Sequence, residues 1–153
     1  MGLDMYLTGK RYLSKYSQGQ DADVAAQIAQ QFPELGTQFG AHNPVQQVSI
    51  RAAYWRKANA VHDWFVRNVQ NGVDNCASYG VSRADLMALR TECELVVDNP
   101  QRAAEVLPTA AGFFFGRTDY DEFYVQDLKN TIEQLNSVLS LPDSWDFDYR
   151  SCW

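Results

Sequence analysis

The sequence predicts an α+β fold, with a small antiparallel sheet and three to four helices in one domain over residues 1–153. Two observations predict it. Both ends of the chain alternate apolar and polar residues, which is typical of strands with one buried face, and the segments between them repeat apolar residues at helical spacing. Because the C-terminal strand carries an aromatic face that must be covered, we expect the N-terminal strand to lie beside it.

The individual elements follow from the same patterns. Strands are expected where side chains alternate or apolar runs are short, at 3–8, 45–52, 79–81, 112–116 and 145–153. Helices are expected where the spacing is helical, at 22–32, 53–71, 82–99 and 118–141, with a short turn at 101–106. Polar residues and Pro or Gly predict a turn at 14–23 and a loop at 33–44. Ser82 with Asp85 resembles a capping box, and Asn71-Gly72 is expected to end the second helix.

Charge and composition exclude several classes of function. The net charge is -6 and the isoelectric point is about 4.8, which opposes non-specific binding to nucleic acid or to anionic membrane surfaces. The sequence has no apolar run long enough to span a membrane. The acidic balance fits a basic protein partner, or a small anion held by a few local cations.

The cysteines do not indicate a metal centre or a cofactor. Cys76, Cys93 and Cys152 are widely spaced and form no CxxC motif, and only two histidines, His42 and His62, are available to join them. We expect no metal and no cofactor, and three reduced thiols in a cytoplasm.

The predicted helix over 53–71 contains the main candidate binding residues. At about 100° per residue, Trp64 falls opposite the apolar arc, with Lys57, Arg67 and Asn68 beside it. An exposed Trp next to cations is a natural stacking platform for an aromatic or anionic ligand, and a typical anchor for a protein partner. The alternative is a helix packed on both sides, with a loop or the 33–44 segment covering Trp64.

Asn59 and His62 lie one turn apart at the edge of the same apolar arc. They are candidate ligand-binding residues that point into a pocket, and His62 is the candidate general acid or base if the chain is a small hydrolase or nucleotide-processing enzyme. The alternative is a buried histidine, hydrogen-bonded to the backbone or to Asn59.

Four stretches together resemble a family of small uncharacterised proteins of tailed bacteriophages and prophages: Met1-Gly-Leu-Asp-Met-Tyr-Leu7, Tyr54-Trp-Arg-Lys-Ala-Asn59 with His62, Trp64 and Phe65, Gly112-Phe-Phe-Phe-Gly116 with Tyr120-Asp-Glu122, and the aromatic end from Trp145 to Trp153. The resemblance implies a phage accessory protein in the bacterial host cytoplasm. Such a protein would bind, without turnover, a host protein or a small nucleotide-like anion, with an anti-defence or host-modulating role. A virion or scaffold component is the other possibility, and the oligomeric state, including a homo-oligomer, stays open.

Overall fold

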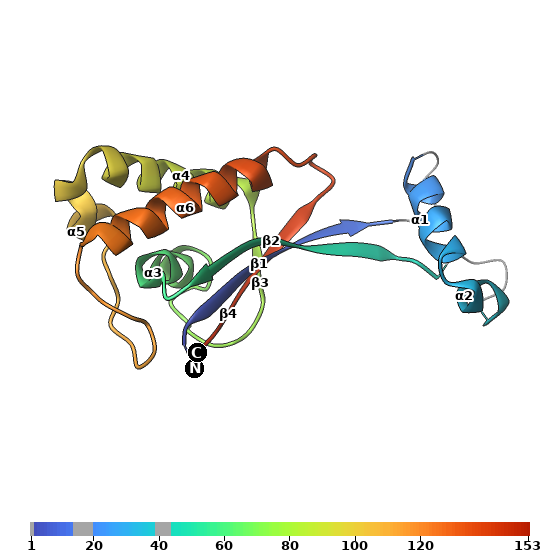
Figure 1. Cartoon of the computed structure of the whole chain (residues 1–153), viewed down its shortest axis with the longest axis horizontal. Helices are drawn as coiled ribbons and strands as arrows, with labels where there is room; N and C mark the ends of the chain where they lie inside the picture. The colour runs from blue at the N-terminus through green and yellow to red at the C-terminus, as the bar shows by residue number, and fades with distance from the viewer. Residues whose placement is uncertain (1, 14–19, 39–43) are drawn as a thin grey trace. The chain divides into compact units, whose positions relative to one another are not determined.

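The computed structural model describes residues 2–13, 20–38 and 44–153 (Figure 1). Four strands form one antiparallel sheet in the order β2-β1-β4-β3. The elements along the chain are β1 (Asp4–Tyr12), α1 (Gln20–Gln30), α2 (Pro33–Gln38), β2 (Gln47–Arg56), α3 (Asn59–Asn68), β3 (Tyr79–Val81), α4 (Arg83–Asp98), the 3-10 turn η1 (Pro100–Arg102), α5 (Ala103–Val106), α6 (Glu122–Leu139) and β4 (Asp146–Cys152). The α+β prediction is confirmed, including the adjacent N- and C-terminal strands β1 and β4.

The chain divides into two compact units, and the boundaries cut β1 after Gly9 and β2 after Ile50. The smaller unit, Lys10–Ile50, holds α1 and α2. Within it the backbone N–H of Leu13 donates to the carbonyl of Gln46 at 2.9 Å, and Arg11 pairs with Asp21. Part of the loop predicted at 33–44 is the helix α2, because Pro33 fits a first helical turn. Residues 39–43 of that loop, and residues 14–19 of the predicted turn, lie outside the described residues; the single-domain interpretation stays a prediction.

The larger unit contains the main core, and its strands follow the predicted alternation. Leu3, Met5 and Leu7 are buried while the side chains between them are partly exposed, and β4 buries every second residue in the same way. Phe65 of α3 stacks on Tyr149 of β4, with ring centroids 3.9 Å apart. Figure 1 shows α4 and α6 side by side, with α3 next to them. The hydrophobic core therefore lies between the sheet and these three helices.

The helix predicted from residue 53 begins only at Asn59, so that prediction is wrong over its first turns. Strand β2 instead continues to Arg56. Its last residues are held by α6: the backbone N–H of Tyr54 donates to Gln134 Oε1 at 2.8 Å, and Trp55 Nε1 donates to Thr131 Oγ1 at 2.9 Å. Aromatic residues suit a strand as well as a helix, and these contacts with a distant helix decide between the two.

Two other local predictions have different outcomes. The capping box is confirmed, since Ser82 and Asp85 bond each other's backbone at the start of α4. The strand predicted at 112–116 is wrong: the backbone N–H of Phe115 closes a turn onto the carbonyl of Gly112, and Gly116 has a φ of +91°. The segment is a loop that buries Phe115 and exposes Phe113. Among the described residues, no helix is long and apolar enough to cross a membrane.

Candidate functional site

Trp64 is in the core, so the expectation that it forms an exposed platform is wrong. Its side chain is only 2% exposed, and its indole Nε1 donates to Glu92 Oε2 of α4 at 2.9 Å. Burial raises the pKa of Glu92, an effect that the indole hydrogen bond partly offsets. The alternative of a helix packed on both sides is therefore the correct one, but the cover is α4, and neither a loop nor the 33–44 segment.

Arg67 and Asn68 lie at the other end of α3 from Lys57. Arg67 is exposed and pairs with Asp63, with 2.6 Å between Nε and Oδ2. Asn68 donates from Nδ2 to the carbonyl of Trp64 at 2.9 Å. The structure thus separates the predicted cluster. Lys57 and Asn59 are at the start of the helix, while Arg67 and Asn68 lie in its last turn.

His62 is a buried histidine between two partners. Its Nδ1 lies 2.8 Å from the hydroxyl of Tyr149, whose pKa burial raises well above the ordinary value. Its Nε2 lies 3.2 Å from Asp74 Oδ1, although the two groups lack the alignment of a hydrogen bond. The imidazole is 1% exposed. We expected a buried histidine to hydrogen-bond the backbone or Asn59, but its partner is Tyr149. A substrate in solvent cannot reach it in this arrangement.

Asn59 is buried and uses its whole amide to fix the loop that precedes α6. Its Nδ2 donates to the carbonyls of Phe115 and Arg117, at 3.1 and 2.7 Å. Its Oδ1 accepts from the backbone N–H of Ala110 at 3.1 Å. One side chain in the first turn of α3 therefore holds both sides of the loop in place. The loop forms one wall of a cavity.

Lys57 forms the turn between β2 and α3 and adopts a left-handed backbone conformation, with a φ of +59°. Its backbone N–H donates to the carbonyl of Leu3 at 2.8 Å, and its own carbonyl accepts from the N–H of Asn59 at 2.9 Å. A Cβ added at Gly116 would lie 3.3 Å from Lys57 Cβ, so the loop approaches closely here. Non-glycine residues pay about 1–2 kcal/mol for this conformation, and such strain often marks a functional position.

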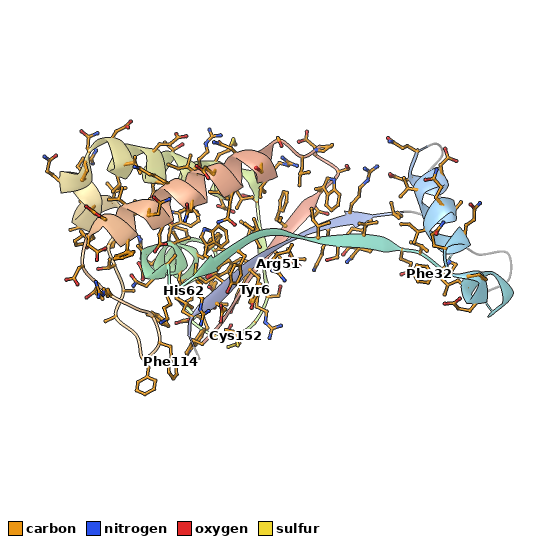
Figure 2. All side chains as sticks on the ribbon, viewed as in Figure 1. Tyr6, Phe32, Arg51, His62, Phe114 and Cys152 are labelled. Carbon is orange, nitrogen blue, oxygen red and sulfur yellow. The ribbon has the colours of Figure 1, made fainter. Side chains whose placement is uncertain are left out.

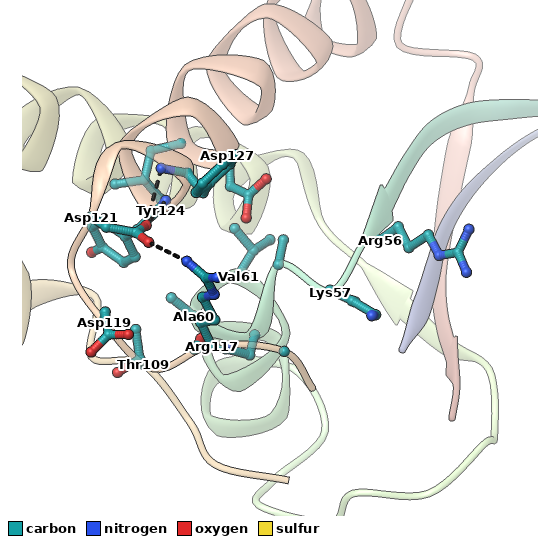
Figure 3. Close-up of a pocket in the computed structure, with 15 residues that line it drawn as sticks. Arg56, Lys57, Ala60, Val61, Thr109, Arg117, Asp119, Asp121, Tyr124 and Asp127 are labelled. Carbon is teal, nitrogen blue, oxygen red and sulfur yellow. Dashed lines mark hydrogen bonds and ion pairs between the residues drawn. The ribbon is translucent and has the colours of Figure 1, made fainter. Parts of the chain in front are cut away.

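A cavity of about 440 Å³ opens at this turn, between the first turns of α3 and α6 and the loop that joins α5 to α6 (Figure 3). Lys57, Asn59, Arg117, Asp121, Phe123 and Asp127 are among the residues that line it. No side chain caps the N-terminus of α3. The backbone N–H groups of Ala60 and Val61, second and third in the helix, therefore have no acceptor within α3. The same two residues line the cavity.

The charges around the cavity are mixed. Arg117 Nη1 lies 3.7 Å from Asp121 Oδ2, the ion pair drawn in Figure 3. Lys57 has no ion-pair partner in the described part of the chain. Burial, with a smaller contribution from Asp121, raises the pKa of Asp127 to about 6. Protonation of Asp127 near pH 6 therefore makes the cavity more positive.

Two aromatic rings are exposed, one on the cavity wall and one on the loop before α6. Phe123 is 71% exposed, and the guanidinium of Arg117 lies 5.9 Å from its ring centroid. Phe113 is 90% exposed and packs edge-on against Phe114, which Figure 2 labels at the tip of the loop. The two glycines at 112 and 116 mark the loop that carries Phe113, but no sequence pattern indicated that Phe123 would be exposed on the cavity.

Comparison with known proteins identifies no relative: no family model, no curated protein and no solved structure matches the chain. Among residues 2–13, 20–38 and 44–153, no cluster of three or more His, Cys, Asp or Glu side chains is placed to hold a metal ion.

Proposed function

We propose that this chain is a binding protein that holds a small, nucleotide-like anion in the cavity at the start of α3, without chemical turnover. The observation that carries the proposal is Lys57. Lys57 precedes an uncapped helix N-terminus and lines a cavity of about 440 Å³. Its ammonium group has no ion-pair partner among the described residues, so its flexible side chain is free to turn toward an anion. That volume is within the range of small-molecule sites, roughly 300–1,000 Å³.

The anionic part of the ligand has three kinds of partner here. The first-turn N–H groups of α3 and the helix dipole favour negative charge at Ala60 and Val61. Lys57 adds a mobile cation, and Arg117 adds a planar donor that can exchange its contact with Asp121 for a phosphate. Charge-assisted hydrogen bonds of this kind are the strongest that a protein offers to an anion.

The rest of the cavity favours a nucleotide over a bare phosphate. Phe123 presents an exposed ring on which a base can stack. Asp119 lines the same cavity, and its carboxylate can accept hydrogen bonds from hydroxyl or amino groups. Inorganic phosphate has no base to stack on Phe123 and no ribose or amino group, so it would gain nothing from this part of the cavity.

The placement of His62 supports binding without turnover. A general acid or base must reach the proton that it transfers, directly or through one water. His62 is buried against Tyr149 and is not among the residues that line the cavity. The small-hydrolase alternative would need another residue to take that role.

A host protein is the second candidate ligand, and the exposed rings of Phe113 and Phe123 favour it. Large apolar side chains in solvent often mark protein interfaces. The phage resemblance provides the setting for both candidates: an accessory protein in a bacterial cytoplasm that sequesters a nucleotide signal or disarms a host component. A virion or scaffold component remains the third hypothesis.

Native mass spectrometry of the protein purified from bacteria tests the proposal. We expect a bound species with the mass of a nucleotide, which reappears when adenosine monophosphate is added to the stripped protein. Lys57→Gly should lose it. A ligand-free protein that binds neither adenosine monophosphate nor other mononucleotides would contradict the proposal, and a co-purifying protein would favour the second candidate.

A further inference from the structure

We propose that Cys76 and Cys152 are a redox modification site, which a low-molecular-weight disulfide such as glutathione disulfide converts into an internal disulfide bond. Both thiols are free and exposed. Cys152 is the last residue of β4, and Cys76 precedes β3, the edge strand that pairs with β4. The third cysteine, Cys93, lies in the core, where burial raises the pKa of its thiol.

The register of these strands would place the two cysteines opposite each other if the ladder continued beyond Tyr79. Tyr79 pairs with Tyr149, and Val81 pairs with Phe147. In an antiparallel pair each step forward on one strand is a step back on the other. Extending the ladder three steps outward from the Tyr79–Tyr149 pair would therefore bring Cys76 opposite Cys152. Opposed residues in such a ladder have Cα atoms about 4.5–5.5 Å apart, which lies within the span of about 4.4–6.8 Å that a disulfide requires.

Both side chains belong on the same, outward face. Strand β4 buries Phe147, Tyr149 and Ser151, so the residues between them, and Cys152 after them, face away from the core. Arg150 is on this outward face, and its Nε donates to the carbonyl of Cys76 at 3.1 Å. The chain at Cys76 thus stays beside the end of β4, although the paired part of β3 begins at Tyr79.

Closing the bond requires movement only in an exposed segment. Residues 71–78 are all exposed. Their local order rests on Asn75, whose Oδ1 accepts from the backbone N–H of Ala77 and the hydroxyl of Tyr79, at 3.0 and 3.1 Å. Segments with few buried contacts open at low free energy, so the ladder can extend toward Cys76 without disturbing the core.

The chemistry is thiol–disulfide exchange and balances with one oxidant molecule. The thiolate of Cys76 attacks a sulfur of glutathione disulfide and displaces one glutathione thiolate, which leaves a mixed disulfide on Cys76. The thiolate of Cys152 then attacks the Cys76 sulfur and displaces the second glutathione. The two protein thiols lose two electrons and two protons, and one glutathione disulfide becomes two molecules of glutathione.

The bond would tie the segment that carries Asp74 to the end of the C-terminal strand. Asp74 is the group that faces His62 Nε2 from this segment. The cross-link also closes a long loop of chain, from Cys76 to Cys152, and so restricts the unfolded state. Long closed loops give the larger stabilisations, and we expect the melting temperature of the oxidised monomer to rise by roughly 10 °C.

The test treats the dilute full-length protein with glutathione disulfide and follows it by intact mass and by non-reducing peptide mapping. We expect a monomer lighter by two hydrogen atoms, with the Cys76 and Cys152 peptides joined and the change reversed by dithiothreitol. Cys76→Ser and Cys152→Ser should each stop at a single glutathione adduct, while Cys93→Ser should behave as wild type. Wild-type protein that accumulates glutathione on both exposed cysteines, or only links between two molecules, would overturn the proposal.

Discussion

Replacing Lys57 with glycine separates ligand binding from folding at one position. Lys57 has a φ of +59°, which costs a lysine about 1–2 kcal/mol. Glycine adopts this conformation freely but loses roughly 0.5–1 kcal/mol of backbone entropy on folding. The two effects leave Lys57→Gly about 0–1.5 kcal/mol more stable than wild type, because no described group pairs with the ammonium.

The same change should weaken anion binding strongly. A hydrogen bond to a charged group contributes about 1.5–3 kcal/mol, so the Kd for adenosine monophosphate should rise roughly ten- to a hundredfold. Isothermal titration calorimetry gives the Kd, and urea unfolding gives the stability. Lys57→Met keeps the stem of the side chain and should also weaken binding.

Arg67→Ala is the matched control for charge. It also removes one cation, but from the last turn of α3 and from a pair with Asp63. Its Kd should equal that of the wild type. An unchanged Kd in Lys57→Gly, or an equal loss in Arg67→Ala, would refute the placement of the anion at the start of α3.

Three further changes test other parts of the account. The phosphate of adenosine monophosphate also ionises at about pH 6, so calorimetry compares two proteins at each pH. The wild-type affinity relative to that of Asp127→Asn should fall as the pH rises through about 6, because Asp127 then ionises beside the anion, and Asp127→Asn should bind more tightly at pH 7.5. Trp64→Ala should cost about 3–5 kcal/mol in urea unfolding, and a near-zero loss would restore the exposed-platform hypothesis. Asn59→Ala should leave the carbonyls of Phe115 and Arg117 without their donor and raise protease sensitivity near Gly112, whereas unchanged cleavage would show that Asn59 does not hold the loop.

Local patterns predicted those parts of the fold whose cause is local. Alternation found β1 and β4 because one face of each is buried, and the need to cover the aromatic face of β4 placed β1 beside it. The capping box of Ser82 and Asp85 is likewise a contact within one helical turn.

The failures come from contacts between distant segments. Tyr54 and Trp55 fit a strand or a helix, and hydrogen bonds to Gln134 and Thr131 of α6 settle the choice. The helical wheel placed Trp64 on the side of α3 opposite the apolar arc. It could not show that α4 covers that side, where Glu92 accepts a hydrogen bond from the Trp64 indole.

The candidate site shows the same limit. Lys57 and Asn59 were predicted as binding residues, and both line the cavity. The cavity itself needs the loop before α6, which Asn59 holds through three hydrogen bonds to residues more than fifty positions away. Neither Asp127 nor Phe123 carries a sequence signal for this role, because their position depends on where α6 begins.

Amide chemical shifts measured during a titration with adenosine monophosphate test the central claim most directly. In ¹⁵N-labelled protein, the backbone N–H signals of Ala60 and Val61 should shift in proportion to occupancy, together with that of Arg117 on the facing loop, and Lys57→Gly should suppress the shifts at equal ligand concentration. Shifts confined to Arg67 and Asn68 at the end of α3, or no shifts at saturating ligand, would contradict a site at the start of this helix.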